Sequence, residues 1–200
     1  MLKKIIFLLL LCIGQAAYAE DGYEVISPAQ PVENPDKIEV IEFFWYGCPH
    51  CYHLEPAMSA WLKNKPANVR FIRQPAVFSE AWGKHAKIFY TAEALGILDK
   101  VHADIFDAIQ NKKEKLLTEE EAAKFFVDHG VKAEDFHNAY NSFAVYTKER
   151  QAESMGSRYG ISGVPALIVN GKYRVTGPSA KSQENMLNVV NQLIQKESNK

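Results

Sequence analysis

A pair of cysteines placed directly after an apolar, strand-like segment constrains the fold of this chain more than any other feature. Residues 38–45 are apolar on both faces apart from two glutamates, and they are rich in β-branched and aromatic side chains. This pattern is typical of a central buried strand. The segment ends at Gly47, and Cys48-Pro49-His50-Cys51 follows. Proline fits the first position of a helix, so we expect the cysteines to open a helix that continues over residues 52–63.

The rest of the chain predicts a helical block that interrupts an α/β domain. Residues 69–73 form a second strand-like segment, and Asn170-Gly171 is a strong hairpin signal between strands at 166–169 and 172–175. Helical spacing of apolar residues and a capping box predict helices over 82–95, 101–109, 122–127, 133–140 and 143–159, and a last helix near the C-terminus. The expected fold class is α/β, with one α/β domain formed by residues 20–78 and 160–200 and a helical insertion over residues 79–159.

The N-terminal segment 1–19 has the tripartite form of a secretory signal peptide. Two lysines precede the apolar run 5–13, and Ala17-Tyr18-Ala19 offers the small residues that a signal peptidase reads. The apolar run is too short to cross a bilayer, which takes about 20 residues. The net charge of the chain is only −1, so there is no electrostatic case for a nucleic acid partner. We expect a cleaved, exported, periplasmic protein.

The exported chain keeps only two cysteines, Cys48 and Cys51, and their spacing indicates redox chemistry. At a helix N-terminus, unpaired backbone N–H groups and the helix dipole favour a thiolate at Cys48, and the thiolate is the reactive form of a thiol. His50 can add a ring N–H or a positive charge, and Pro49 fixes the turn. Cys51, one turn further on, is expected to be more buried and to act as the resolving thiol.

Two other interpretations of the cysteine pair are weaker. A structural disulfide that closes so small a ring constrains almost no chain. A zinc site would have to use Cys48, His50, Cys51 and His53, and structural zinc ligands usually come as two separated pairs. The sequence therefore predicts no metal and no bound cofactor.

Together, several segments resemble the DsbA family of periplasmic thiol:disulfide interchange proteins. They are Glu42-Phe43-Phe44 before Cys-Pro-His-Cys, the helical insertion, Gly163-Val164-Pro165, and Val169-Asn170-Gly171-Lys172-Tyr173. The resemblance covers essentially the whole exported chain. It implies a thioredoxin fold with an inserted α-helical domain, and an enzyme that introduces disulfide bonds into exported proteins through Cys48 and Cys51. It further implies substrates that are unfolded or reduced exported proteins, and re-oxidation by a quinone-linked membrane oxidase similar to DsbB. We expect a monomer.

The resemblance also assigns roles outside the cysteine motif. It implies that Pro165 is cis and faces the cysteines, and that Val164 offers its backbone to an extended substrate. Glu42 matches a buried acid beneath the active site, and Arg73 matches the position of its lysine partner in the family. A buried carboxylate is costly unless it is paired, so the alternative is that Glu42 reaches the surface at a strand end.

Other aromatic and histidine side chains leave alternatives open. Trp45 and Tyr46 fit either a substrate groove or the core. We interpret the histidines of the helical block as solvated or hydrogen-bonded: His85, His102, His129 and His137.

Two other functions compete with a disulfide-forming oxidant. The first is a thiol reductase or isomerase, although residues 20–47 are too few for the separate dimerisation domain of an isomerase of this family. The second is an exported peptide-binding chaperone that uses the same groove without redox turnover. A reduction potential measured against glutathione separates the three.

Overall fold

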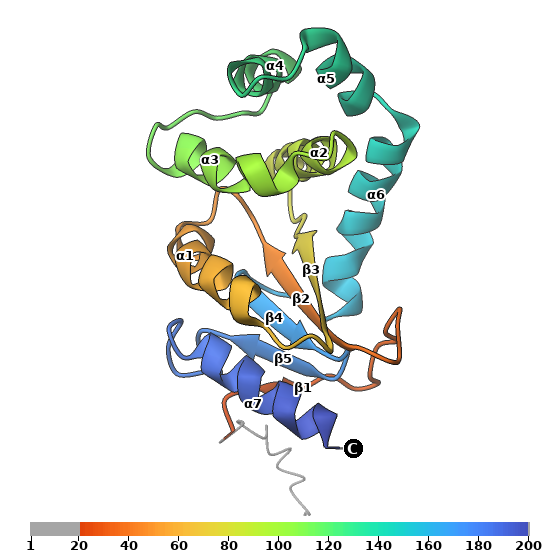
Figure 1. The fold of residues 1–200 in the computed structure, drawn as a ribbon, viewed down its shortest axis with the longest axis vertical. Coiled ribbons are helices and arrows are strands. Elements are labelled where there is room, and N and C mark those ends of the chain that lie inside the picture. The colour runs from red at the N-terminus through yellow and green to blue at the C-terminus, as the bar shows by residue number, and fades with distance from the viewer. Residues whose placement is uncertain (1–20, 200) are drawn as a thin grey trace, which may run out of the picture.

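The computed structural model describes residues 21–199, and its centre is a five-stranded sheet with strand order β1-β5-β4-β2-β3 (Figure 1). The strands are β1 (Glu24–Val25), β2 (Ile38–Phe44), β3 (Val69–Pro75), β4 (Ala166–Val169) and β5 (Tyr173–Thr176). Strand β2 lies between parallel β3 and antiparallel β4, and all seven of its residues are buried. The predicted central strand is therefore correct, and the sheet is mixed because β4 and β5 form a hairpin.

The hairpin follows from its two turn residues. Asn170 and Gly171 have φ values of 52° and 65°, the left-handed region that a two-residue turn of this kind requires and that asparagine and glycine tolerate best. The Lys172 N–H donates to the Val169 carbonyl at 3.0 Å and closes the turn. The strand ladder resumes with the pairing of Val169 and Tyr173, which leaves Lys172 as a third loop residue.

Helices cover both faces of the sheet and build a separate lobe. The helices are α1 (Pro49–Asn64), α2 (Glu80–Ala94), α3 (Leu98–Gln110), α4 (Glu119–Asp128), α5 (Ala133–Tyr140), α6 (Phe143–Arg158) and α7 (Met186–Ser198). In Figure 1, α2–α5 lie above the sheet and α6 runs down the side of the molecule back to it. One core cluster joins α1 and α7 to one sheet face, through residues such as Met58 and Val190. On the opposite face, Phe43 packs in a cluster that also contacts Met155 of α6.

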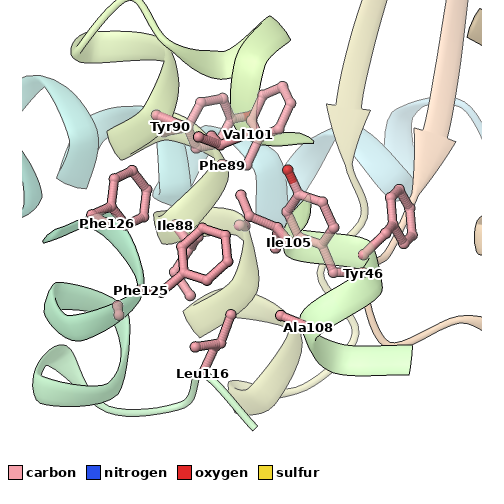
Figure 2. Close-up of a cluster of buried hydrophobic side chains, with 14 of the residues drawn as sticks. Tyr46, Ile88, Phe89, Tyr90, Val101, Ile105, Ala108, Leu116, Phe125 and Phe126 are labelled. Carbon is pink, nitrogen blue, oxygen red and sulfur yellow. The ribbon is translucent and has the colours of Figure 1, made fainter. Parts of the chain in front are cut away.

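A third core cluster fills the helical lobe and reaches the cysteine-bearing loop. Figure 2 shows Tyr46, which follows β2, among the buried side chains of α2, α3 and α4. The ring of Tyr46 packs edge-on against Phe106 of α3, with centroids 4.8 Å apart. The side-chain amide of Gln110 also donates to the carbonyl of Tyr46 at 2.8 Å. The loop that leads to Cys48 is therefore fixed by the lobe as well as by the sheet.

The elements expected from the sequence are present in the expected order; β1 is an additional strand, and the other differences lie at element ends. The capping box of α4 is present, with Thr118 and Glu121 bonding each other's backbone N–H groups. Strand β3 runs to Pro75, two residues beyond the expected end, because its pairing with β2 continues to Phe44. The predicted signal peptide, residues 1–19, lies outside the described residues. Within residues 21–199, no helix has both the length and the apolar character needed to cross a bilayer.

Candidate active site

Cys48 caps the N-terminus of α1, as the motif predicts. Its backbone is extended, with φ −91° and ψ 116°, and Pro49 begins the helix behind it. The backbone N–H of Cys51 donates to Cys48 Sγ at 3.4 Å. A hydrogen bond from the Cys51 thiol, helped by the backbone N–H groups of Cys51 and His50 and by the His50 charge, lowers the pKa of Cys48 from 9.0 to about 6 despite burial. The helix start therefore favours the thiolate.

Cys51 has the opposite character. Its side chain is 1% exposed, against 7% for Cys48. Burial, and then its hydrogen bond to Cys48, raise the pKa of Cys51 well above the ordinary value. Both thiols are free, so the geometry describes the reduced pair, in which one thiol ionises near neutral pH while its neighbour stays protonated.

The loop before β4 lies directly against Cys48. The Val164–Pro165 peptide bond is cis, as the resemblance implied, and so is Ser27–Pro28, which the sequence did not indicate. The Cys48 thiol donates to the carbonyl of Val164 at 3.4 Å, although the two residues are 116 positions apart. The antiparallel pairing of β4 with β2 brings them together, because β2 ends and β4 begins at this end of the sheet.

A groove of about 1090 Å³ opens beside the cysteines, between α1, the cis-proline loop and the segment before α7. Its lining includes His50, Leu54, Val164, Pro165, Gln183 and Met186. The mixture of apolar side chains with a few polar groups suits an extended polypeptide.

Neither Trp45 nor Tyr46 lines this groove. Trp45 stacks on Trp82 with ring centroids 4.2 Å apart, and Tyr46 is 1% exposed. Both side chains therefore pack against the protein interior and do not form part of a substrate groove.

A buried ionic cluster forms close to Cys51, and Glu42 belongs to it. Glu42 is 1% exposed, so it does not reach the surface. It pairs with Arg73 across the β2–β3 ladder, but the Arg73 Nη1 to Glu42 Oε2 distance is 3.7 Å, and among the described residues Glu42 Oε2 has no hydrogen-bond partner. Burial raises the pKa of Glu42 to about 7, against the attraction of Arg73. The charge of Glu42 in turn helps to raise the pKa of Cys51.

Arg73 bonds most strongly to Glu55, which sequence reasoning did not assign to the site. Two hydrogen bonds of 2.8 Å join the guanidinium to the two carboxylate oxygens of Glu55. Burial raises the pKa of Glu55, but hydrogen bonds from His102 and Arg73 outweigh it and lower the pKa to about 2. Glu55 follows Cys51 by four residues in α1, so helical periodicity alone places both side chains on one face.

His102 joins this cluster from the helical lobe. Its Nδ1 lies 2.8 Å from the Tyr46 hydroxyl, and its Nε2 contacts the Arg73 guanidinium. Burial lowers the pKa of His102 to about 4, so the ring is neutral at neutral pH. His85 is hydrogen-bonded as expected, with Nε2 2.8 Å from the Lys115 carbonyl, but its buried Nδ1 has no partner in the described chain.

Thiol–disulfide exchange is the chemistry that this arrangement supports, since a thiol that ionises near neutral pH lies beside a second thiol that stays protonated. The fold and the site together define a thioredoxin-fold thiol:disulfide oxidoreductase. Residues 72–191 match the family described as the DSBA-like thioredoxin domain, and the chain belongs to the DsbA family.

Characterised relatives extend the match over most of the chain. The thiol:disulfide interchange protein DsbA of Azotobacter vinelandii is 48% identical over 84% of this chain and 78% of its own length. That of Pseudomonas aeruginosa is 43% identical over 92% and 90%. The crystal structure of Pseudomonas aeruginosa DsbA superposes with a TM-score of 0.84 at 43% identity, covering 88% of this chain and 92% of that one. The predicted thioredoxin fold with an inserted helical domain is confirmed.

Proposed function

We propose that the protein is an oxidant that introduces disulfide bonds into exported proteins. In its oxidised form, a substrate thiolate attacks the Sγ of Cys48, a mixed disulfide forms, and the sulfur of Cys51 leaves. A second substrate thiolate then attacks the substrate sulfur of the mixed disulfide and expels Cys48 as a thiolate. The substrate ends with one disulfide, and the enzyme ends with two reduced cysteines, so two electrons move from substrate to enzyme.

The stabilised Cys48 thiolate is the observation that favours an oxidant over a reductase. A group that stabilises the reduced form of a dithiol makes its disulfide a stronger oxidant. The pKa of about 6 means that Cys48 leaves readily as a thiolate, because a thiol of low pKa is the better leaving group. Pro49 and His50 would support this state through the helix start, and Glu42 would act on the buried thiol of Cys51.

Val164 and Pro165 form the proposed substrate-binding loop. The Val164 carbonyl already accepts a hydrogen bond from Cys48, so a substrate strand placed along this loop would bring its cysteine to the reactive sulfur. The groove beside the loop supplies apolar contacts at Leu54 and Met186. Backbone pairing of this kind recognises an extended chain largely independently of its sequence, which suits unfolded substrates.

The cellular setting of the proposal follows from the sequence features and the family. Residues 1–19 would direct export and be removed, residues 20–78 and 160–200 would form the thioredoxin-like domain, and residues 79–159 would form the inserted lobe. In the periplasm, a quinone-linked membrane oxidase similar to DsbB would restore the Cys48–Cys51 disulfide. The protein would act as a monomer.

One measurement tests the proposal against its rivals. The redox equilibrium of the Cys48–Cys51 pair with glutathione gives its reduction potential, and an oxidant is expected well above the thioredoxin value of about −270 mV. A potential near that value would assign the protein to the reductases. A peptide-binding chaperone would bind reduced substrates without transferring a disulfide to them.

A further inference from the structure

The peptide group that joins His50 to Cys51 is hydrogen-bonded at both ends. Its N–H, carried by Cys51, donates to Cys48 Sγ at 3.4 Å. Its carbonyl, carried by His50, accepts a hydrogen bond of 2.6 Å from the side-chain amide of Gln183. A continuous path of hydrogen bonds therefore runs from Gln183 through one backbone unit to the reactive sulfur.

Gln183 comes from a distant part of the chain, 133 residues after His50. It lies between β5 and α7, in a segment that lines the groove next to the first turn of α1. The segment is braced internally, since the Asn185 side chain donates to the Ala180 carbonyl at 3.0 Å and the Met186 N–H donates to the Gln183 carbonyl at 3.2 Å. Gln183 is thus presented to the cysteine motif by a fixed loop.

Hydrogen bonds in series strengthen one another, because a donor on a carbonyl draws electron density from the peptide group and makes its N–H more positive. The effect is largest where the final acceptor is charged, as a thiolate is. The backbone N–H of Cys51 is one of the groups that favour the Cys48 thiolate.

We propose that Gln183 is a positioning residue for thiol–disulfide exchange: its side-chain amide holds and polarises the His50–Cys51 peptide group, so that the Cys51 N–H donates more strongly to Cys48 Sγ. The inference rests on the proposed function, in which Cys48 is the reactive thiol. The groove would then have two roles, because the segment that lines it next to a bound substrate would also stabilise the Cys48 thiolate.

The expected size of the effect follows from the hydrogen bond that is strengthened. Cooperativity of about 10–30% on one charge-assisted hydrogen bond corresponds to about 0.2–0.6 pH units in the pKa of Cys48. Removing the Gln183 donor should raise that pKa by this amount. The same change should move the equilibrium with glutathione about two- to fourfold toward the oxidised enzyme.

The test is Gln183→Met, which keeps the length and volume of the side chain and removes the donor. The pKa of Cys48 is read from the ultraviolet absorbance of its thiolate in the reduced protein, where Cys51 stays protonated because its pKa is raised well above the ordinary value. The matched control is Gln195→Met, on the exposed face of α7. Both substitutions leave in place the titratable groups of the motif and groove, which are Cys51, His50, His53, Glu184, Glu24 and Arg174.

A rise in the pKa of Cys48 in Gln183→Met, with no change in Gln195→Met, would support the inference, and Gln183→Ala should show the same rise. A pKa within about 0.1 pH units of the unmodified protein would overturn it, even if Gln183→Met lowered the stability of both redox forms equally. Mass spectrometry of the alkylated protein separates the two proposals. Labelling at Cys51 instead of Cys48 would overturn the proposed function and this inference together, whereas labelling at Cys48 with an unchanged pKa would overturn this inference alone.

Discussion

The stability of the reduced protein should rise relative to that of the oxidised protein as pH increases through the pKa of Cys48. The folded pKa of about 6 lies below the ordinary 9.0, so the thiolate stabilises the fold. This contribution is complete above about pH 9 and is lost as pH falls through about 6. From these two pKa values, it amounts to about 1.4 kcal/mol at pH 7 and about 2.7 kcal/mol at pH 8.

The oxidised protein has an opposing advantage from its closed ring. For a ring of four residues, the loss of chain entropy in the unfolded state is worth about 1.9 kcal/mol. The two free energies of unfolding should therefore cross near pH 7.4, with the oxidised form more stable by about 2 kcal/mol at pH 5 and the reduced form by about 1 kcal/mol at pH 8. Groups that titrate alike in both redox forms, such as His102, cancel in the difference between the two free energies of unfolding.

Paired urea melts of the two redox forms, at about pH 5, 7 and 8, measure this difference. The variant Cys48→Ser serves as the control, because its reduced form should lose the added stability above pH 6. A difference between redox forms that stays constant from pH 5 to pH 8 would refute the reasoning, since it would mean that the fold does not stabilise the Cys48 thiolate.

Five further substitutions have defined outcomes. Cys48→Ser should abolish disulfide transfer to a reduced substrate, whereas Cys51→Ser should accumulate mixed disulfides through Cys48, which non-reducing electrophoresis detects; accumulation in both variants would contradict the assigned roles. Glu42→Gln should raise stability at pH 8 by on the order of 2 kcal/mol and have little effect near pH 4. The folded pKa of about 7 lies above the ordinary 4.5, so the native protein loses stability as pH rises from about 4.5 to about 7, where the unfolded carboxyl ionises before the native one; denaturant melts at both pH values decide this. Gly47→Ala should cost about 1–3 kcal/mol, because a Cβ there would overlap the Trp45 indole; Gly163→Ala, where a Cβ meets nothing within 4 Å, should melt like the unmodified protein.

The elements of the fold could be predicted because each has a local signal. The apolar run of β2, the Asn170-Gly171 turn and the Thr118 capping box all act over a few residues, so their patterns are visible in the sequence. The position of Cys48 at a helix N-cap follows from the same kind of pattern. The place of Val164 beside it does not, because it depends on the pairing of β4 with β2, and only the resemblance to a known family supplied it.

The ionic cluster shows where sequence reasoning ends. Glu42 and Arg73 lie opposite each other on neighbouring strands, which fits the family pattern. Whether they form a hydrogen-bonded ion pair depends on where a third charged side chain lies. Glu55 takes both hydrogen bonds from Arg73 and leaves Glu42 at 3.7 Å. His102 enters from a helix whose packing direction no local pattern encodes. Periodicity could have found Glu55, whereas His102 required the tertiary structure.

The late position of β4 in the chain delays completion of the site during synthesis. A ribosome makes the N-terminus first, so Cys48 exists well before the strand that occupies the sheet next to β2 and before Val164, 116 residues later. Gln183 is made later still. Until then β2 lacks one of its two neighbours, and the cis-proline loop beside Cys48 is missing, although Cys51 and His50, the groups that lower the pKa of Cys48, are already made. The nascent chain therefore carries its cysteine pair well before the loop that completes the site around it.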